Sequence, residues 1–415
     1  MASPQAPAEP SFGTTLELEE LVAAVLARNA GLAAMAAAVR AARARVDQAT
    51  ALEDPIASAT LAPLSLGGGT RLGYEVRASQ RIPYPGKRKL RGEVAGDEAT
   101  VAAEALQATR VELAARAVSL YADYYLNARE LEVNAEHLAL LGAFKEVATA
   151  RYAAGLVPQQ APIQAEVEAA RMLHHEIELR ATGREIVAAL DALLHRPAES
   201  PLPPTPATLP AGGPPVVEHG TPRLQEVTER PELRAQSAEV AARQGELELA
   251  RRARQPDFEA MAGYSSMWDT PEHRVTVGVG VSLPIRRARI RAEVAGAQAR
   301  LEQAEADLER LTDTFRAEAV SAVAHREEMA HLVELYRDRV LPAAHDQVAA
   351  ARASFESGEE SMLGLIAAER SLRDAQQQYH EAVAGFVRAR AAEARSLGEL
   401  PGQQNAAATP PPAER

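Results

Sequence analysis

Side chains able to do chemistry are thinly spread along this sequence. His174, His175 and Glu176 stand together in a helical stretch, but adjacent helical side chains point about 100° apart and do not converge on one ion. The 415 residues include no cysteine, which excludes disulfides and thiolate metal sites. A nucleotide-binding glycine loop and a Ser/His/Asp arrangement are also missing from the sequence. We therefore predict a protein that is not an enzyme, with no cofactor and no bound metal.

The charge balance limits the partners. The formal net charge is −12, and only 45 residues are Lys or Arg, so nucleic acid is not expected as a partner.

No apolar run approaches the ~20 residues of a transmembrane helix. The first residues lack the charged and apolar regions of a signal peptide. We expect residues 1–13 to be a disordered leader, whether natural or left after an export signal was removed.

The sequence contains two similar halves. R-G-E-V-A-G at 91–96 recurs as R-A-E-V-A-G at 291–296, and A-R-Y-A-A-G at 150–155 recurs as A-S-F-E-S-G at 353–358. Pro55 and Pro83 have counterparts 201 residues later in Pro256 and Pro284. Collinear matches with two fixed prolines indicate a tandem duplication rather than chance similarity.

Each copy has the same predicted order of elements. We expect a first repeat at 14–196 and a second at 222–400, joined by a Pro/Gly-rich linker at 197–221 and followed by a disordered tail at 401–415. Each repeat begins with two helices, at 15–28 and 31–52 or at 222–228 and 232–254. A β-hairpin follows, then a long helix (86–153; 286–355) and a return helix (159–196; 361–398).

Three local signals refine these helices. Thr14 and Glu17 fit a capping box at the start of the first helix. A glycine, Gly155 or Gly358, marks the turn after each long helix. Pro342 falls inside the second long helix, where we expect a kink or bulge that is either a static bend or a functional hinge.

The strands in the two predicted hairpins, 56–82 and 257–283, carry the most informative pattern. In R-V-T-V-G-V-G-V-S-L-P the valines alternate with threonine, glycine and serine. The apolar set of the two hairpins is Leu72, Tyr74, Val76, Val275, Val277, Val279 and Val281. Glu75, Arg77 and Arg81 occupy the opposite face and need water. Strands of this length suit a transmembrane barrel with these apolar residues facing lipid, whereas the alternative is two soluble hairpins packed on helices.

The strand number bears on assembly. Four strands per chain cannot close into a barrel, and open edges in lipid leave unpaired backbone groups. Three chains would supply twelve strands, an even number that can close. The fold class expected is therefore mainly α, with long-helix hairpins and a small transmembrane β part shared among three copies.

The whole arrangement resembles the TolC-type outer-membrane efflux family over residues 14–400. The segments that carry the resemblance are T-L-E-L-E-E-L-V-A-A-V-L-A-R-N (15–29), S-Q-R-I-P-Y-P-G-K (79–87), R-Y-A-A-G-L-V (151–157), L-L-H-R-P (193–197) and S-L-P-I-R-R-A-R (282–289). The S-Q-x-I-P-x-P-G-K form is similar to the heavy-metal branch, whose members serve cobalt–zinc–cadmium or copper pumps.

The resemblance implies a structure and partners. Family members are homotrimers with a twelve-stranded barrel in the outer membrane of Gram-negative-type bacteria and a tunnel of twelve helices in the periplasm. The expected function is an exit duct that passively conducts substrates, metal cations or drugs, from an inner-membrane pump. The expected partners are a periplasmic adaptor protein, outer-membrane lipid and an inner-membrane pump. The pump expected is of the resistance-nodulation-division type, and the alternatives are an ABC transporter or a type I secretion system.

The resemblance also assigns roles to the helical turns. The adaptor is expected to contact Gly155, Leu156, Val157, Gly358 and Ser361. The periplasmic aperture is expected at Glu359, Glu360, Gln160 and Gln164. Some relatives carry aspartates at the start of the second return helix, but this sequence has Gly364 and Ala367 there.

The roles of the aperture residues stay open. Three copies of Glu359 and Glu360 would form a ring that favours cations. The alternative is that the two glutamates are an ordinary helix N-terminus, favourable with the helix dipole. Gln160 and Gln164 either hydrogen-bond neighbouring helices across a closed entrance or are simply solvated.

Two cationic segments, K-R-K-L-R at 87–91 and R-R-A-R-I-R at 286–291, follow the hairpins. Beside a membrane-spanning strand, we expect them to meet lipid headgroups or acidic residues of a neighbouring subunit.

A different class of function is also compatible with the long helices. The chain could be a soluble coiled-coil scaffold or adaptor with two small hairpins, although a scaffold has no reason to keep the matched strand faces.

Overall fold

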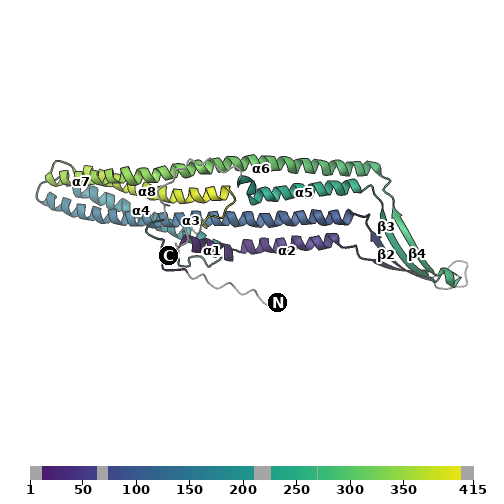
Figure 1. Ribbon diagram of the computed structural model, residues 1–415. Coiled ribbons are helices and arrows are strands. Elements are labelled where there is room, and N and C mark those ends of the chain that lie inside the picture. Colours follow the sequence, from purple (N-terminus) through teal and green to yellow (C-terminus); the bar gives the residue numbers. More distant parts are fainter. Residues whose placement is uncertain (1–11, 63–72, 210–225, 269, 403–415) are drawn as a thin grey trace, which may run out of the picture. The chain divides into compact units, whose positions relative to one another are not determined.

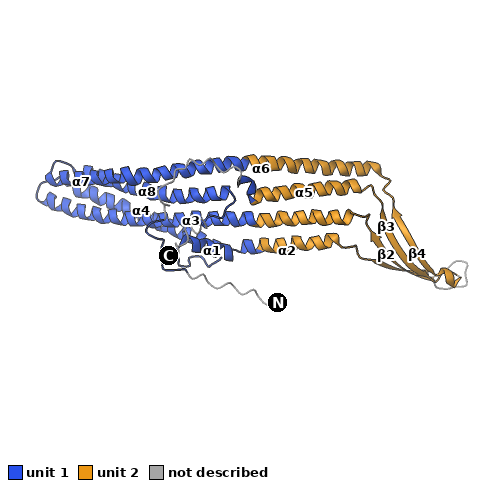
Figure 2. Ribbon diagram, in the orientation of Figure 1, with its two compact units in different colours: residues 1–33, 107–230, 314–415 blue, residues 34–106, 231–313 orange. Residues whose placement is uncertain are grey.

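A computed structural model describes residues 12–62, 73–209, 226–268 and 270–402. These residues form two compact units, shown in blue and orange in Figure 2. Unit 1 contains residues 1–33, 107–230 and 314–415, and unit 2 contains residues 34–106 and 231–313. Each unit combines segments from both predicted repeats.

Unit 2 is a layer of four helical segments that continue into four strands. The helices are α2 (Ala30–Thr50), the first part of α3 (Lys87–Ala153), α5 (Pro231–Arg252) and the first part of α6 (Arg287–Leu335). The strands are β1 (Ile56–Ala62), β2 (Gly73–Ile82), β3 (Asp257–Ser265) and β4 (Val275–Ser282), with a short 3₁₀ turn η2 (Pro271–His273) before β4. The helical segments lie in the order α2, α3, α5, α6 in Figure 1. The strands have the matching order β1-β2-β3-β4, because each strand directly follows or precedes one of these helices.

The sheet is antiparallel throughout, in the order β1-β2-β3-β4. Its register pairs Leu61 with Tyr74, Val76 with Tyr264, and Ala262 with Val277. Directly paired residues of antiparallel strands project to the same face. The predicted agreement between the apolar faces of the two hairpins is therefore confirmed for residues 73–82 and 275–282. Leu72 lies outside the described residues.

Unit 1 is helical. It contains α1 (Leu18–Arg28), the rest of α3, α4 (Gln160–Leu194), a 3₁₀ turn η1 (Glu226–Glu229), the end of α6, a π-helix η3 (Tyr336–Val340), α7 (Leu341–Ser357) and α8 (Met362–Ser396). Its main core packs α1, α3, α4 and α8 together around fully buried side chains such as Leu21, Tyr121, Leu190 and Ala384. A second core near the two helical turns joins α3, α4, α7 and α8.

Most predicted elements agree with the structure to within three residues. In the hairpin predicted at 257–283, the first strand ends at Ser265, because the backbone N–H of Ser265 donates to the Arg274 carbonyl at 2.8 Å and closes the hairpin. The helix predicted at 222–228 is, in its described part, the 3₁₀ turn η1. The bulge predicted near Pro342 is confirmed as the π-helix η3, which ends two residues before the proline.

The predicted capping box at Thr14 and Glu17 is wrong. Helix α1 begins at Leu18, and Glu17 occupies the N-cap position without a side-chain cap. The chain stays non-helical up to this point because the Leu16 N–H donates to the Pro204 carbonyl and the Tyr121 hydroxyl donates to the Leu16 carbonyl, both at 2.9 Å. These two bonds hold the chain away from the helical conformation that a capping box at Thr14 requires.

Among the described helices, no single one is both long enough and apolar enough to cross a membrane. Taken together, α1 and α2 meet the length and composition that crossing requires.

Candidate functional sites: the helical turns and the sheet

The first turn ends α3 through a left-handed glycine. Gly155 has φ +73°, and its N–H donates to the Tyr152 carbonyl at 2.9 Å, while the Leu156 N–H donates to the Arg151 carbonyl at 2.9 Å. This pair of bonds is a Schellman motif, which glycine favours because it has no Cβ. Leu156 is exposed, and Val157 packs on the core of the turn.

The second turn repeats this geometry. Gly358 has φ +83° and donates to the Phe355 carbonyl, while the Glu359 N–H donates to the Ser354 carbonyl at 2.9 Å. Ser361 then caps α8, because its hydroxyl accepts a hydrogen bond from the Gly364 N–H at 3.3 Å. The duplicated turn therefore has a duplicated backbone structure, with an exposed leucine in one copy and two glutamates in the other.

The two glutamates are both exposed but differ in their contacts. The Glu360 carboxylate accepts from the Ser361 N–H at 2.8 Å and lies over Gly364, where an added Cβ would meet its oxygen at 2.4 Å. A carboxylate at this position interacts favourably with the helix dipole. In this chain, the Glu360 carboxylate interacts with the start of its own helix, and a side chain at position 364 would require the Glu360 side chain to move.

Gln160 and Gln164 lie in the first turn and a half of α4. Gln160 is exposed and Gln164 is half-buried. Between them, Ala161 and Ala165 face the core of the turn. The two glutamines thus belong to a different side of α4 from the core residues.

Arg151 joins the two turns and was not singled out from the sequence. Its guanidinium donates to the carbonyls of Phe355 and Glu356 and lies 5.0 Å above the Phe355 ring centroid. The repeat could have drawn attention to Arg151, because Arg151 and Phe355 lie in the repeated segments that precede the two glycines. This cross-link fixes the end of α3 against the end of α7.

A buried carboxylate lies further along the same helices. Glu168 of α4 is 4 % exposed and forms ion pairs with Arg370 and Arg373 of α8 and with Arg171 one turn away. The hydrogen bond from Arg370 is the main cause that lowers the pKa of the Glu168 carboxyl. No sequence motif marked this cluster, because its members are about 200 residues apart.

His174 and His175 of α4 both contact one carboxylate on the same helix. His174 is exposed and His175 is half-buried, and each ring lies 3.3 Å from the Glu178 carboxylate. Within the part of the chain that the structure describes, no group of three or more His, Asp or Glu is placed to hold a metal ion.

The sheet has one apolar face and one polar face. The apolar face includes Leu61, Tyr74, Val76, Ile82, Val275, Val277, Val279 and Val281, all of them exposed. Val277 is the extreme case at 83 %. The opposite face has Glu75 paired with Arg77 at 2.6 Å, together with small residues such as Gly263 and Gly278. An apolar surface of this kind marks a site of contact with lipid or with another protein.

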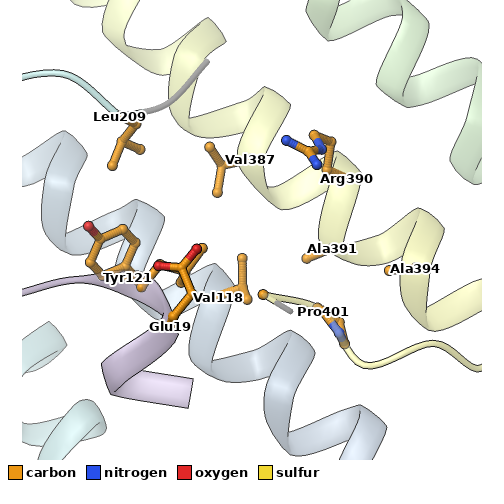
Figure 3. A pocket seen from close by; sticks show the side chains of 11 residues that line it. Glu19, Val118, Tyr121, Leu209, Val387, Arg390, Ala391, Ala394 and Pro401 are labelled. Atoms are coloured by element: carbon orange, nitrogen blue, oxygen red, sulfur yellow. The ribbon is translucent and has the colours of Figure 1, made fainter. Parts of the chain in front are cut away.

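Unit 1 also holds a small cavity, of about 70 Å³, shown in Figure 3. The side chains of Val118, Tyr121, Leu209 and Val387 give it apolar walls, and Glu19 and Arg390 stand at its edges. This volume holds a few water molecules and is far below the several hundred Å³ of a small-molecule site. The cavity therefore offers no substrate pocket.

Duplicated long-helix hairpins, joined to a four-stranded sheet with an exposed apolar face, define a fold that outer-membrane channels share. Residues 225–399, nearly all of the second repeat, match the family described as outer membrane efflux protein. No curated protein sequence is significantly similar to the chain.

Three solved structures share the fold over nearly the whole chain. The outer-membrane channel OprN is 21 % identical with a TM-score of 0.78, and 96 % of each chain is covered. CusC, described with its transmembrane channel formation, is 19 % identical with a TM-score of 0.81, covering 96 % of this chain and 99 % of CusC. The outer membrane protein VceC from Vibrio cholerae is 19 % identical with a TM-score of 0.79, covering 92 % and 96 %. Because the chain is about equally similar to all three structures, the comparison does not single out the heavy-metal branch.

Proposed function

We propose that this protein is a passive exit duct that spans the outer membrane as a homotrimer and extends into the periplasm. The observation that carries the proposal is the exposed apolar face of the sheet. Placing large apolar side chains such as Val277 and Val279 in water forgoes about 25 cal/mol for each Å² of apolar surface that lipid would cover. A membrane removes this cost.

The edges of the sheet support a shared assembly. Strands β1 and β4 are the outer strands, so each has one side without a neighbour in the described part of the chain. In lipid, each unpaired backbone group costs several kcal/mol, and only a closed barrel satisfies them all. Three copies of the four-stranded sheet give twelve strands, which can close edge to edge with the polar faces lining water.

The helical turns then form the periplasmic end of the duct. In this proposal Gly155, Leu156, Val157, Gly358 and Ser361 contact a periplasmic adaptor protein. Glu359, Glu360, Gln160 and Gln164 surround the aperture. An inner-membrane pump, of the resistance-nodulation-division type in the branch that the sequence resembles, supplies the energy. Exported metal cations or drugs are the substrates.

The first test is the mass of the protein extracted from outer membranes in detergent after expression with an export signal. Light scattering, with the detergent subtracted, should give about three times 44.3 kDa. A monomer or dimer that stays in solution without detergent would contradict the duct. It would favour the soluble scaffold, in which the valine faces belong to an ordinary sheet.

The second test addresses the aperture and uses the lack of native cysteine. Glu359→Cys, labelled with a bulky maleimide, should lower the conductance of the protein in planar bilayers several-fold. Ile177→Cys is the matched control, because Ile177 is an exposed residue further along α4. Equal conductance of the two labelled variants would remove Glu359 from the aperture.

A further inference from the structure

A broad groove lies in unit 2 where the strands meet the helices. It has a volume of about 740 Å³ and is lined by the end of β2, the starts of α3 and α6, the last turns of α5 and the segment after β4. Six of its lining residues are cationic: Arg81, Lys87, Arg91, Arg286, Arg289 and Arg300. Only three carboxylates, those of Glu246, Asp257 and Glu293, line it.

Half of these cations are already paired. Lys87 is buried and donates to Asp257 at 2.8 Å, Arg300 lies 3.8 Å from Glu246, and Arg81 lies 3.9 Å from Glu53. The other three, Arg91, Arg286 and Arg289, are exposed. Across the described residues, none of these three has a carboxylate within 4.0 Å. The groove therefore keeps a surplus of positive charge after its internal pairing.

The helix starts increase this surplus. Both α3 and α6 begin with cationic residues and have no acidic residue in the first turn. The N-terminal end of a helix carries partial positive charge, and an exposed cation there costs about 0.3–1 kcal/mol. Placing cations at the starts of α3 and α6, with no acidic residue in either first turn, is therefore less favourable unless an anion binds nearby.

The groove belongs to the polar side of unit 2. Arg81, Asp257 and Ser282 line it, and the strand register places all three on the polar face, since Arg81 pairs with Glu259 and Asp257 pairs with Ser282. An anion in the groove thus lies beside the water-facing surface of the sheet.

We propose that this groove is a binding site for phosphate-bearing anions, with Arg91, Arg286 and Arg289 as the main ligands. Guanidinium groups suit this chemistry because each can donate two parallel hydrogen bonds to phosphate oxygens. The site as such does not depend on the proposed duct. One consequence does rest on that function: inside a duct, the groove would attract anionic cargo and repel metal cations.

The experiment is a calorimetric titration of the full chain, in detergent at low salt, with inorganic pyrophosphate as the probe. The variant Arg286→Gln/Arg289→Gln should bind at least about tenfold more weakly than the unmodified protein, because it loses two charge-assisted contacts. The matched control is Arg287→Gln/Arg291→Gln, which removes two charges from the same helix start but no lining residue of the groove. It should bind like the unmodified protein.

A second arm identifies the source of the phosphate. Flotation with phosphatidylglycerol vesicles, compared with phosphatidylcholine vesicles, tests a lipid headgroup as the ligand. A groove-specific loss in either arm supports the site, and the arm that shows it names free anion or lipid as the source. No binding of either probe, or an equal loss in both double variants, would overturn the proposal.

The titration also separates this site from the duct. It needs no channel and no trimer, so a protein of the wrong mass that still binds pyrophosphate through the groove would refute only the proposed function. A detergent-requiring trimer without groove-specific binding would refute only the anion site.

Discussion

Units 1 and 2 differ in how far their apolar and charged side chains find partners within the chain. Unit 1 buries its large apolar residues in two cores and surrounds Glu168, one of its buried carboxylates, with three arginines. Unit 2 has only a small helical core around Leu247 and Leu301, exposes the valines of its sheet, and leaves three arginines of its groove without carboxylates in the described chain.

This difference separates residues that hold the chain together from residues that face other molecules. A side chain already satisfied within the chain contributes to stability, and its loss should be visible in the isolated protein. A side chain that is left unsatisfied contributes only when lipid, a second subunit or a ligand is present. Substitutions in the two units should therefore respond differently to the surroundings.

The sharpest contrast is between a buried and an exposed leucine. Leu190→Ala in unit 1, at a residue with 0 % exposure, should lower the free energy of unfolding by about 2–5 kcal/mol. Leu283→Ala in unit 2, at 70 % exposure, should change it by no more than about 0.5 kcal/mol. Guanidinium unfolding in detergent, followed by circular dichroism, measures both. Equal losses would show that the sheet junction is buried within the isolated chain.

A charge on the apolar face should act only through the membrane. Val277→Arg should disfavour insertion into lipid by about 2–4 kcal/mol, because the charge would face hydrocarbon. Thr276→Arg is the matched control, since Thr276 is the neighbour of Val277 in β4 and projects to the polar face. The fraction of protein integrated into vesicles after refolding reports the difference. Similar integration of the two variants would mean that lipid does not cover this face.

The Glu168 cluster should make the stability of unit 1 depend on pH. Because the pKa of this carboxyl is lowered in the folded protein, its contribution is complete above the unfolded pKa of about 4.5 and is lost as the pH falls through the folded pKa. Glu168→Gln should therefore cost about 1–3 kcal/mol at pH 7, and progressively less as the pH falls below about 4.5. Glu166→Gln, at an exposed position of the same helix, controls for the substitution. A pH-independent loss would assign the effect to packing.

The smallest expected effect concerns the turn glycines. Gly358→Ala should destabilise by about 1–2 kcal/mol through backbone strain alone, since an added Cβ would meet nothing within 4 Å and φ is +83°. Gly142→Ala, in the interior of α3 and equally free of contacts, should stabilise by up to about 1 kcal/mol. Opposite signs in thermal unfolding would confirm that the turn requires a left-handed residue.

Periodic features of the sequence predicted most of the fold. The helix ranges and the strand faces followed from spacing, and the two turns and the irregularity near Pro342 followed from single glycine and proline residues. Each of these features depends on neighbours within a few residues. The start of α1 did not follow. Its N-terminus is set by hydrogen bonds from Tyr121 and to Pro204, more than 100 residues away, and no local motif records them.

The candidate sites divide in the same way. The turn residues were found because the duplication placed two glycines in equivalent segments. The cationic groove was only partly visible, since the two Arg-rich segments were evident but their convergence with Glu246 and Asp257 was not. Arg151 and the Glu168 cluster were missed, because an isolated arginine or glutamate in a helix carries no signal of the carbonyl or guanidinium that it will meet.

The π-helix at Tyr336–Val340 also bears on how the two copies diverged. Arg91 and Arg291 are 200 residues apart, whereas Gly155 and Gly358 are 203 apart, so the second copy has gained three residues between these points. A π-helix takes more residues per turn than an α-helix, because each of its hydrogen bonds spans one residue more. The wider turns therefore accommodate added length without ending the helix. The π-helix η3 lies within the stretch in which the two copies differ in length, so part of that difference fits inside a continuous helix.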